Sequence, residues 1–440
     1  MFYGDLHRHT QLSRCSLDKD GTREDAYRYA RGPGRLDFVA ITDHYQHLRP
    51  LSWFRSMRDV ERYHVPGRLV TLPAIERLID DKGHYNAVYL DGGEVTFDTG
   101  RWRSLERSDT PKPEHGLLVP HMMGSPLNPF AWERFDPERM RLFEVYQGYR
   151  GSYEGKGLPY EADDREVDDA SLVRGQRLGA HFGLIASSDH NSTGTSFAAV
   201  RCDELTRAAV FGALRDRSTF AATAPYRVDA SLGPLGLGAA GPAPADAPLQ
   251  LRATAPVPLA YVEVVKNGLV LERRAGTGRG ELFALSSHVG FRVGRNAIRV
   301  ELGAAELGAL RQRLSGETGA QLERTPREFE LSTIGWGPLD VVFELVPEDS
   351  VAGAEIAVAM GAVSRRVGAG ELALGRSREL PFGSERLHLW RLGPPLGEAA
   401  GQLEFPDPDR KPGDQYYARV VWVDGNVAWT SPIQVTEIAD

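Results

Sequence analysis

Short, continuous apolar segments recur through the first half of this 440-residue chain and constrain its fold more than any other feature. Each has the length and composition of a strand that is buried on both faces, as in a parallel sheet. They span residues 2–6, 38–41, 69–75, 85–90, 117–119, 142–145 and 182–186. Helix-like stretches, the first of which begins with the capping residue Thr22, lie between or after them at 22–31, 51–64 and 203–217. Strands that alternate with helices predict an α/β barrel or a doubly wound sheet.

The second half of the chain carries hairpin signals instead. Asn267-Gly268 and Asp424-Gly425 are tight-turn dipeptides, and strand-like runs flank them at 259–265, 269–273, 419–423 and 427–430. Before these hairpins, the stretch GPLGLGAAGPAPADAPLQ is rich in glycine, proline and alanine, which is typical of a linker. We therefore predict an α/β domain at 1–227 and a β-rich, sandwich-like domain at 228–440, with the boundary within 225–248.

Charge and composition exclude several classes of function. A formal net charge of -8 argues against broad nucleic-acid binding, which needs a positive surface. No apolar run is long enough to span a bilayer, and the N-terminus lacks the pattern of a signal peptide, so we expect a cytoplasmic protein that binds no membrane. Cys15 and Cys202 lack the paired spacing of a disulfide framework or a structural zinc site. The sequence leaves the oligomeric state open.

Ionisable residues follow most apolar segments of the first half, and they provide the main evidence on function. These residues are Asp5, His7, His9, Asp43, His44, Glu76, His121, Glu144, Asp189 and His190. In barrels and open α/β sheets, active sites form outside the carboxyl ends of the strands, so side chains at these positions converge. His84 is the exception because it precedes its strand, and only a reversed or irregular strand would aim it inward.

Imidazole and carboxylate together suit zinc, manganese or iron, whereas calcium prefers oxygen alone. A single histidine at a strand end is more often a hydrogen-bonded loop residue than a ligand, but repetition at five strand ends favours a metal site. His7 and His9 are two residues apart, so on an extended strand they point to the same side. Eight candidate ligands are too many for one ion and suit two or three.

Roles beyond ligation follow from the same positions. Glu76 and Asp189 are expected to act in catalysis by bridging neighbouring ions, which would polarise a phosphoryl oxygen and activate a water. Glu144 is a ligand, a catalytic base or, as we favour, a residue that orients an imidazole, and Asp43 is expected to orient a neighbouring histidine. Three arginines next to ligand positions are candidates for binding an anionic substrate: Arg8, Arg14 and Arg77. We expect His47 and His64 to be surface residues.

In this order, the segments GDLHRHT, ITDH, PAIE, GHYNAV, VPHM and IASSDH resemble the metal-binding motifs of the PHP (polymerase and histidinol phosphatase) superfamily. EVYQGYRGSYEG, SSDHNSTG and the C-terminal AWTSPI resemble more closely its DUF3604-like branch, so the resemblance spans nearly the whole chain. The resemblance implies a distorted, TIM-like (β/α)7 barrel and phosphoester hydrolysis with a metal-activated water at a site for two or three ions. Carried over by position, it implies eight metal ligands: His7, His9, His44, Glu76, His84, His121, Asp189 and His190.

The chain departs from the superfamily's pattern at two places. Many members have Ser-Asp-Gly where this chain has Ser13-Arg14-Cys15, so a common acidic group is missing. Many also have Asp-x-His in the last motif, whereas Asp189 and His190 are adjacent, so the chain must turn there for both to ligate. The leading hypothesis is a phosphatase or phosphodiesterase acting on a small phosphorylated molecule. Hydrolysis of an amide, lactone or glycosidic bond stays open, as does a glycan- or protein-binding module on a metal-loaded scaffold.

Overall fold

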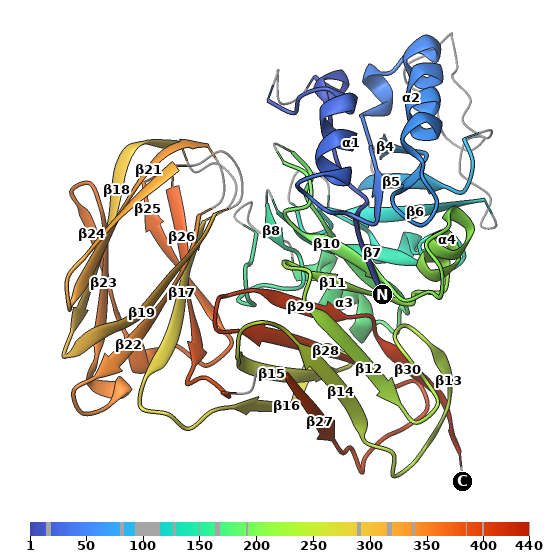
Figure 1. The fold of residues 1–440 in the computed structure, drawn as a ribbon. Coiled ribbons are helices and arrows are strands. Elements are labelled where there is room, and N and C mark those ends of the chain that lie inside the picture. The colour runs from blue at the N-terminus through green and yellow to red at the C-terminus, as the bar shows by residue number, and fades with distance from the viewer. Residues whose placement is uncertain are drawn as a thin grey trace.

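The computed structural model (Figure 1) describes residues 1–14, 19–79, 83–92, 115–125, 129–148, 150–162, 168–190, 192–287, 292–314, 319–336, 339–383, 385–397 and 400–439. Cys15 lies outside these ranges, and Cys202 is a partly exposed free thiol. The described residues contain thirty β-strands and four α-helices. β-Structure therefore dominates the molecule.

All four described α-helices lie in the first half: α1 (Arg23–Arg31), α2 (Pro50–Tyr63), α3 (Leu172–Arg177) and α4 (Arg207–Arg215). The strands of this half are β1 (Phe2–Asp5), β2 (Phe38–Ala40), β3 (Val70–Leu72), β4 (Ala74–Ile79), β5 (Gly83–Tyr89), β6 (Gly116–His121), β7 (Leu142–Gln147), β8 (Gly151–Ser152), β9 (Gly183–Ser187), β10 (Phe197–Val200) and β11 (Thr219–Ala222). Every apolar segment predicted to form a strand does so, and the three predicted helices correspond to α1, α2 and α4. Thr22 caps α1 because its side chain accepts a hydrogen bond from the backbone N–H of Asp25.

The directions of these strands overturn the predicted α/β, TIM-like (β/α)7 barrel. Such a barrel consists of parallel strands that are each followed by a helix. Among the named strands of this half, only the pairs β1–β2, β2–β3 and β7–β9 are parallel. β4, β5 and β6 form an antiparallel meander, and β10 pairs antiparallel with β1 and β11. The described strands form six sheets, and none of these closes on itself. The prediction was wrong because a continuous apolar segment indicates burial on both faces but not the direction of a strand.

One buried apolar cluster joins the strands of the first half. It contains side chains from β2 to β7, β9 and β10, such as Phe38, Leu72, Val88, Val119 and Ile185. Burying this much apolar surface fixes where the strands lie relative to one another. The ionisable residues at or beyond the strand ends therefore meet at one edge of this cluster.

Among the described residues of the second half, the regular elements are strands and short 3-10 turns. These strands are β12 (Arg227–Leu232), β13 (Ala240–Pro244), β14 (Leu249–Thr254), β15 (Leu259–Lys266), β16 (Leu269–Ala275), β17 (Glu281–Ser287), β18 (Arg292–Gly303), β19 (Ala305–Leu314), β20 (Gly319–Arg324), β21 (Glu328–Trp336), β22 (Leu339–Pro347), β23 (Glu355–Met360), β24 (Val363–Gly368), β25 (Ser377–Phe382), β26 (Glu385–Gly393), β27 (Ala400–Phe405), β28 (Gln415–Trp422), β29 (Val427–Thr430) and β30 (Ile433–Ala439). The hairpins predicted at Asn267-Gly268 and Asp424-Gly425 are confirmed as β15–β16 and β28–β29. Asn267 and Gly268 both have a positive φ, as a type I′ turn requires.

Strands β17 to β26 form a separate part of the second half, on the left of Figure 1. Two five-stranded sheets compose it, with the orders β19-β22-β17-β26-β25 and β20-β21-β18-β23-β24. Side chains from both sheets share one apolar cluster that includes Phe283, Val300, Phe343 and Ile356. This part therefore has its own core, separate from the cluster beneath the ionisable residues.

A single sheet crosses the predicted domain boundary. An eleven-stranded sheet contains nine strands in the order β13-β30-β28-β29-β11-β10-β1-β2-β3, and β15 and β16 join it at β28, so C-terminal strands pair with strands of the first half. The stretch predicted to be a linker contains β13, which pairs with β30 at the edge of this sheet. Pro242 and Pro244 fit there because an edge strand does not need every backbone N–H. The limits 1–227 and 228–440 therefore do not coincide with a break in the sheet.

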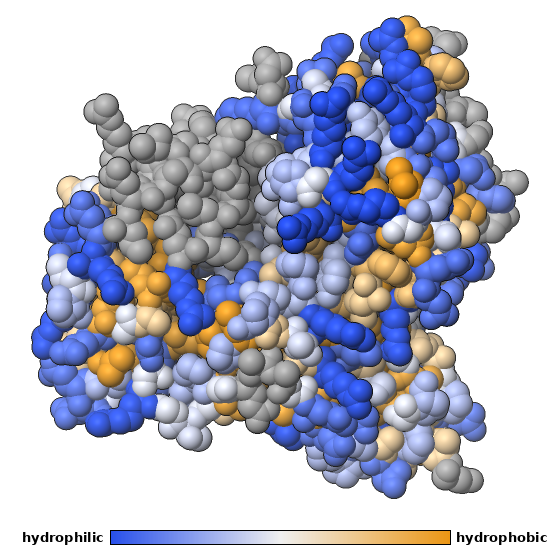
Figure 2. Space-filling model, in the orientation of Figure 1, coloured by the Kyte–Doolittle hydropathy of each residue, from blue (hydrophilic) through white to orange (hydrophobic). Residues whose placement is uncertain are grey.

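Among the residues that Figure 2 colours, hydrophilic ones predominate in the region of α1 and α2 at the upper right. Large apolar side chains that are exposed, such as Leu51 and Phe54 of α2, are few among the described residues. None of the helices described is long and apolar enough to cross a bilayer.

Candidate metal centre

The structure brings all eight predicted ligands to one place. They come from the ends of β1, β2, β6 and β9 and from within β4 and β5: His7, His9, His44, Glu76, His84, His121, Asp189 and His190. Seven of them form three groups whose donor atoms lie within 4.8 Å of one another, namely His9–His44–His190, His7–His9–Glu76 and Glu76–His84–His121. The eighth, Asp189, joins them because its Oδ1 lies 3.2 Å from His9 Nε2.

Glu76 lies at the centre of this cluster, and its side chain is almost fully buried. Its Oε2 is 2.8 Å from His9 Nε2 and 3.3 Å from His44 Nδ1. Its Oε1 is 3.1 Å from His84 Nδ1 and 3.2 Å from His121 Nε2. The two oxygens thus face different groups of imidazoles, which is the arrangement that a bridging carboxylate needs.

The tautomer of His9 follows from the residues behind it. Ser13 Oγ donates a hydrogen bond to Asp43 Oδ1 at 2.8 Å and accepts one from the backbone N–H of His44. A hydroxyl has only one hydrogen, so at 2.8 Å His9 Nδ1 must donate to Ser13 Oγ. In neutral His9 the other ring nitrogen, Nε2, is therefore a bare acceptor, and it points at the cluster. Asp43 orients His9 through Ser13 rather than directly.

Glu144 fixes the tautomer of His7 in the same way. Its two oxygens lie 3.2 and 3.1 Å from His7 Nδ1, and Gln147 Nε2 donates to Oε1 at 2.5 Å. The carboxylate is the acceptor, so His7 Nδ1 carries a hydrogen, and in neutral His7 the other ring nitrogen, Nε2, is bare. In this geometry Glu144 is placed to orient the imidazole of His7.

The bare nitrogens face one another and the carboxylates. His7 Nε2 and His9 Nε2 are 3.1 Å apart, and Asp189 Oδ1 is 3.4 Å from the former. Glu76 Oε2 has no hydrogen-bond partner among the described residues although it is buried. Burying so many acceptors together costs free energy unless positive charge lies among them. The donor set of imidazole and carboxylate fits divalent zinc, manganese or iron.

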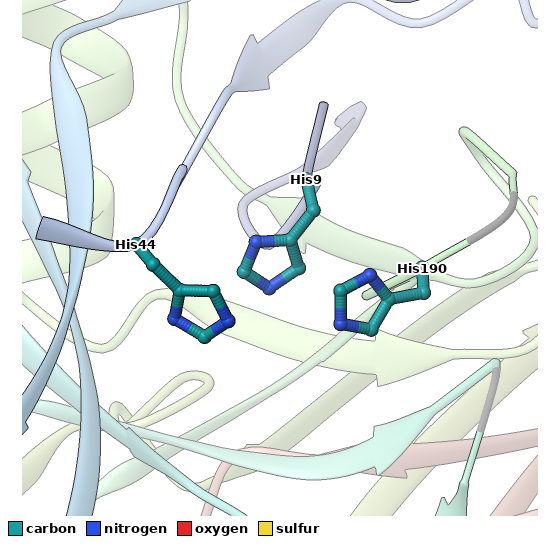
Figure 3. Close-up of side chains that lie close together, drawn as sticks. All are labelled: His9, His44 and His190. Atoms are coloured by element: carbon teal, nitrogen blue, oxygen red, sulfur yellow. The ribbon is translucent and has the colours of Figure 1, made fainter. Parts of the chain in front are cut away.

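His44, His9 and His190 lie in a row with their rings close together (Figure 3). The centroids of His9 and His190 are 4.2 Å apart with the rings nearly parallel, and those of His9 and His44 are 4.6 Å apart. His190 Nδ1 donates to Asp20 Oδ2 at 2.8 Å, which leaves its Nε2 directed at Asp189. Asp20 therefore fixes the tautomer of His190, as Ser13 fixes that of His9.

A turn allows Asp189 and His190 to enter the cluster together. Asp189 has a φ of 69°, in the left-handed region that aspartate tolerates better than most residues. Its backbone N–H donates to the carbonyl of His7, and its carbonyl accepts from the N–H of His9. Buried Asp5 holds the same loop by accepting from the N–H groups of Ser188 and Gly194. The turn that adjacent ligands require is thus present.

His84 reaches the cluster because of the direction of its strand. β5 runs antiparallel to β4 and β6, and His84 lies directly opposite His121 in the register. The start of β5 is therefore at the same end of the meander as the end of β6. A histidine that precedes its strand lies at the site for this reason.

The charges of the cluster perturb its pKa values. Burial raises the pKa of Glu76, but His9, His121 and His44 outweigh burial and hold that pKa well below its usual range. Burial lowers the pKa of His44, and with the neighbouring His9 and His190 it brings the value to about 3. Burial also lowers the pKa of His7, whereas Glu144 and Asp189 more than reverse the shift and raise it well above its usual range. Strong coupling of this kind is typical of functional sites.

The three arginines predicted to bind substrate are placed differently. Arg8 is buried, and its guanidinium bonds to Asp20 and to Thr193 Oγ1, so it supports the orientation of His190. Arg14 is exposed at the end of the short turn after His9. Arg77 lies on β4 next to Glu76, and neighbouring residues on a strand point to opposite faces. Its guanidinium accordingly stacks over the ring of Tyr45, 5.0 Å from the centroid.

Several residues at the site were not predicted. Arg150 follows β7, and its Nε lies 3.3 Å from Asp189 Oδ2 with one fifth of the side chain exposed. His47, expected at the surface, is half-buried, with its ring 5.6 Å from that of His44. Asp20, Ser13 and Gln147 orient ligands from behind, as described above. Arg150 could have been suspected from its basic charge within the motif EVYQGYRGSYEG, but the others carry no sequence signal.

Comparisons with known proteins give little further information. No family model matches the chain, and no solved structure matches it significantly. One curated relative, an uncharacterized protein of Chlamydia pneumoniae, is 21% identical over 256 residues, which cover 51% of this chain. The matched region spans 40% of that relative's length.

Proposed function

We propose that this chain is a metal-dependent hydrolase of phosphate esters, related in its site to the PHP superfamily that its motifs resemble. One observation carries the proposal: buried imidazoles and carboxylates converge on Glu76, and three of the imidazoles, His7, His9 and His190, are held in a fixed orientation by Glu144, Ser13 and Asp20. A structural histidine cluster would instead pair donors with acceptors. The arrangement at His7 and His9 supports ligation because their bare nitrogens lie 3.1 Å apart.

Three groups of residues would hold two or three ions. His7 and His9 with Glu76 Oε2 and Asp189 form the first, and His84 and His121 with Glu76 Oε1 form the second. The row of His9, His44 and His190 forms the third. When bound, divalent ions supply Lewis acidity toward a phosphoryl oxygen and lower the pKa of a water. Glu76 and Asp189 contribute to catalysis by fixing the spacing of these groups.

Arg150 supports phosphate as the electrophile. Its guanidinium reaches the edge of the cluster at Asp189 while part of the side chain stays in solvent. A planar guanidinium can hold two oxygens of a phosphoryl group at once, which suits a small phosphorylated substrate. Hydrolysis of an amide, lactone or glycosidic bond would not need a cation at this position.

The test combines metal analysis with a substrate screen. We expect purified protein to contain two or three transition-metal ions per chain and, loaded with manganese, zinc or iron, to hydrolyse a member of a broad panel of phosphate esters. His9→Ala should lose both the ions and the activity. His115→Ala, which alters a half-exposed histidine paired with Asp91, is the matched control and should lose neither. Wild-type protein without stoichiometric metal, or turnover of amide, lactone or glycoside substrates alone, would refute the proposal.

A further inference from the structure

Asn86 is a buried carboxamide beside the metal centre that no motif singled out as a ligand. It lies on β5, the central strand of the β4–β5–β6 meander, directly opposite Glu76 on one side and Val119 on the other. Paired residues on neighbouring strands point to the same face, and so do residues two apart on one strand. Asn86 therefore shares the face of Glu76, His84 and His121.

The surroundings of Asn86 make its amide costly to bury. Only 1% of the residue is exposed, and among the described residues neither its Nδ2 nor its Oδ1 has a hydrogen-bond partner. On the same face, the next row of side chains away from the histidines is Ala74, Val88 and Leu117, which belong to the apolar cluster. An apolar residue of the same size would be more stable at this position unless the amide has a polar partner. On this face of β4, β5 and β6 the ionisable side chains are Glu76, His84 and His121, so a polar partner for the amide is to be expected on their side.

We propose that Asn86 is a further residue of the metal centre and that its carboxamide oxygen serves the cation held by Glu76, His84 and His121. This group has three protein donors, whereas Asp189 Oδ1 adds a fourth donor to the group of His7, His9 and Glu76. A neutral amide oxygen adds a ligand of the kind that divalent manganese and iron accept without adding charge to a site that already contains two carboxylates. The inference rests on the proposed metal centre but not on the bond that is hydrolysed.

The test compares Asn86→Leu with Asn86→Asp and measures ion binding rather than turnover. Leucine keeps the volume and removes both polar atoms, so we expect one ion fewer per chain, or an affinity for that ion lower by about 10- to 100-fold in competition with a chelator. Asn86→Asp keeps an oxygen in place and should retain the ion. Without metal, Asn86→Leu should melt no lower than wild type, because it removes an unpaired amide.

Gln176→Leu is the control, since Gln176 of α3 is also a buried carboxamide with an oxygen that lacks a partner among the described residues. It should leave ion binding unchanged. If Asn86→Leu binds the same number of ions with wild-type affinity, or lowers the melting temperature equally with and without metal, Asn86 is a structural residue and the inference is wrong. Wild-type protein that binds its ions but hydrolyses no phosphate ester would refute the proposed function alone.

Discussion

Replacing Ser13 by alanine tests whether the hydrogen bond from His9 Nδ1 to Ser13 Oγ sets the orientation of His9. Ser13 Oγ is fully buried and has three partners: it donates to Asp43, and it accepts from His9 Nδ1 and from the backbone N–H of His44. Ser13 Oγ is the hydrogen-bond partner of His9 Nδ1 among the described residues. Ser13→Ala therefore changes no ligand but removes the contact that selects the tautomer of one.

Ser13→Ala is expected to have two separate effects, one on the free energy of unfolding and one on metal affinity. The substitution leaves the Nδ1–H of His9 and the N–H of His44 without an acceptor in a buried site. Each unsatisfied donor costs about 1–3 kcal/mol, so the free energy of unfolding of the metal-free protein should fall by about 2–4 kcal/mol after relaxation. Losing the residue that orients a ligand lowers metal affinity by about 10- to 100-fold.

Urea denaturation in the presence of a chelator measures the first effect, and competition with a chromogenic chelator measures the second. Ser192→Ala is the control, because its hydroxyl bonds to Thr195 Oγ1 in a partly buried loop outside the cluster. Its metal affinity should stay unchanged. If Ser13→Ala binds metal as tightly as wild type, the bare Nε2 of His9 is not what holds the ion, and the tautomer argument is refuted.

Three further predictions concern the substrate, the pH and the shared sheet. Arg150→Ala should raise the KM for a phosphate ester by about tenfold or more, because it removes a charge-assisted contact, whereas exposed Arg14→Ala should not; a lower kcat at constant KM would contradict this role. Burial lowers the pKa of His181 from 6.5 to about 4. The free energy of unfolding is therefore unaffected by this residue above about pH 6.5, where His181 is neutral in both states. As the pH falls toward 4 the unfolded chain takes up the proton first, and the free energy of unfolding falls by about 3 kcal/mol. Urea denaturation of metal-free His181→Gln should show a flatter pH dependence than wild type, and an equal slope would count against this. A chain that ends at Arg227 loses β29, the partner of β11, and should show no cooperative thermal unfolding by circular dichroism; a sharp transition would show that the first half folds alone.

The convergence of the candidate ligands could be predicted because its signal is local. A histidine or carboxylate directly after a buried strand needs no knowledge of the partner strand to be placed at the strand's end. Even the turn at Asp189 follows from two adjacent residues that must both face the site. What the sequence could not show was how the strands pair, because apolar segments of parallel and antiparallel strands look alike when both faces are buried. The barrel prediction failed there, and the same lack of directions left His84 uncertain.

The residues that orient the candidate ligands could not be predicted from the sequence, for a different reason. Asp20 and Ser13 are separated from the strand ends by turns, and their side chains act on His190 and His9 only after the chain has folded back. Arg8 and Arg77 show the converse error. Both adjoin ligands in sequence, but adjacent residues point to opposite sides of an extended chain, so proximity in sequence places them away from the centre.

C-terminal residues pack against two strands that lead into the candidate metal centre, β7 and β9. Tyr146 of β7 packs against Trp429 of β29, with ring centroids 5.8 Å apart, and Trp429 Nε1 donates to buried Glu154 at 2.7 Å. Ser431 Oγ accepts from the backbone N–H of Leu184 on β9. β7 carries Glu144, and β9 leads directly to Asp189, so C-terminal residues hold both strands that deliver these carboxylates. A separate glycan- or protein-binding module would have no need of such contacts. We therefore expect the C-terminal strands β28 to β30 to be required for metal binding itself.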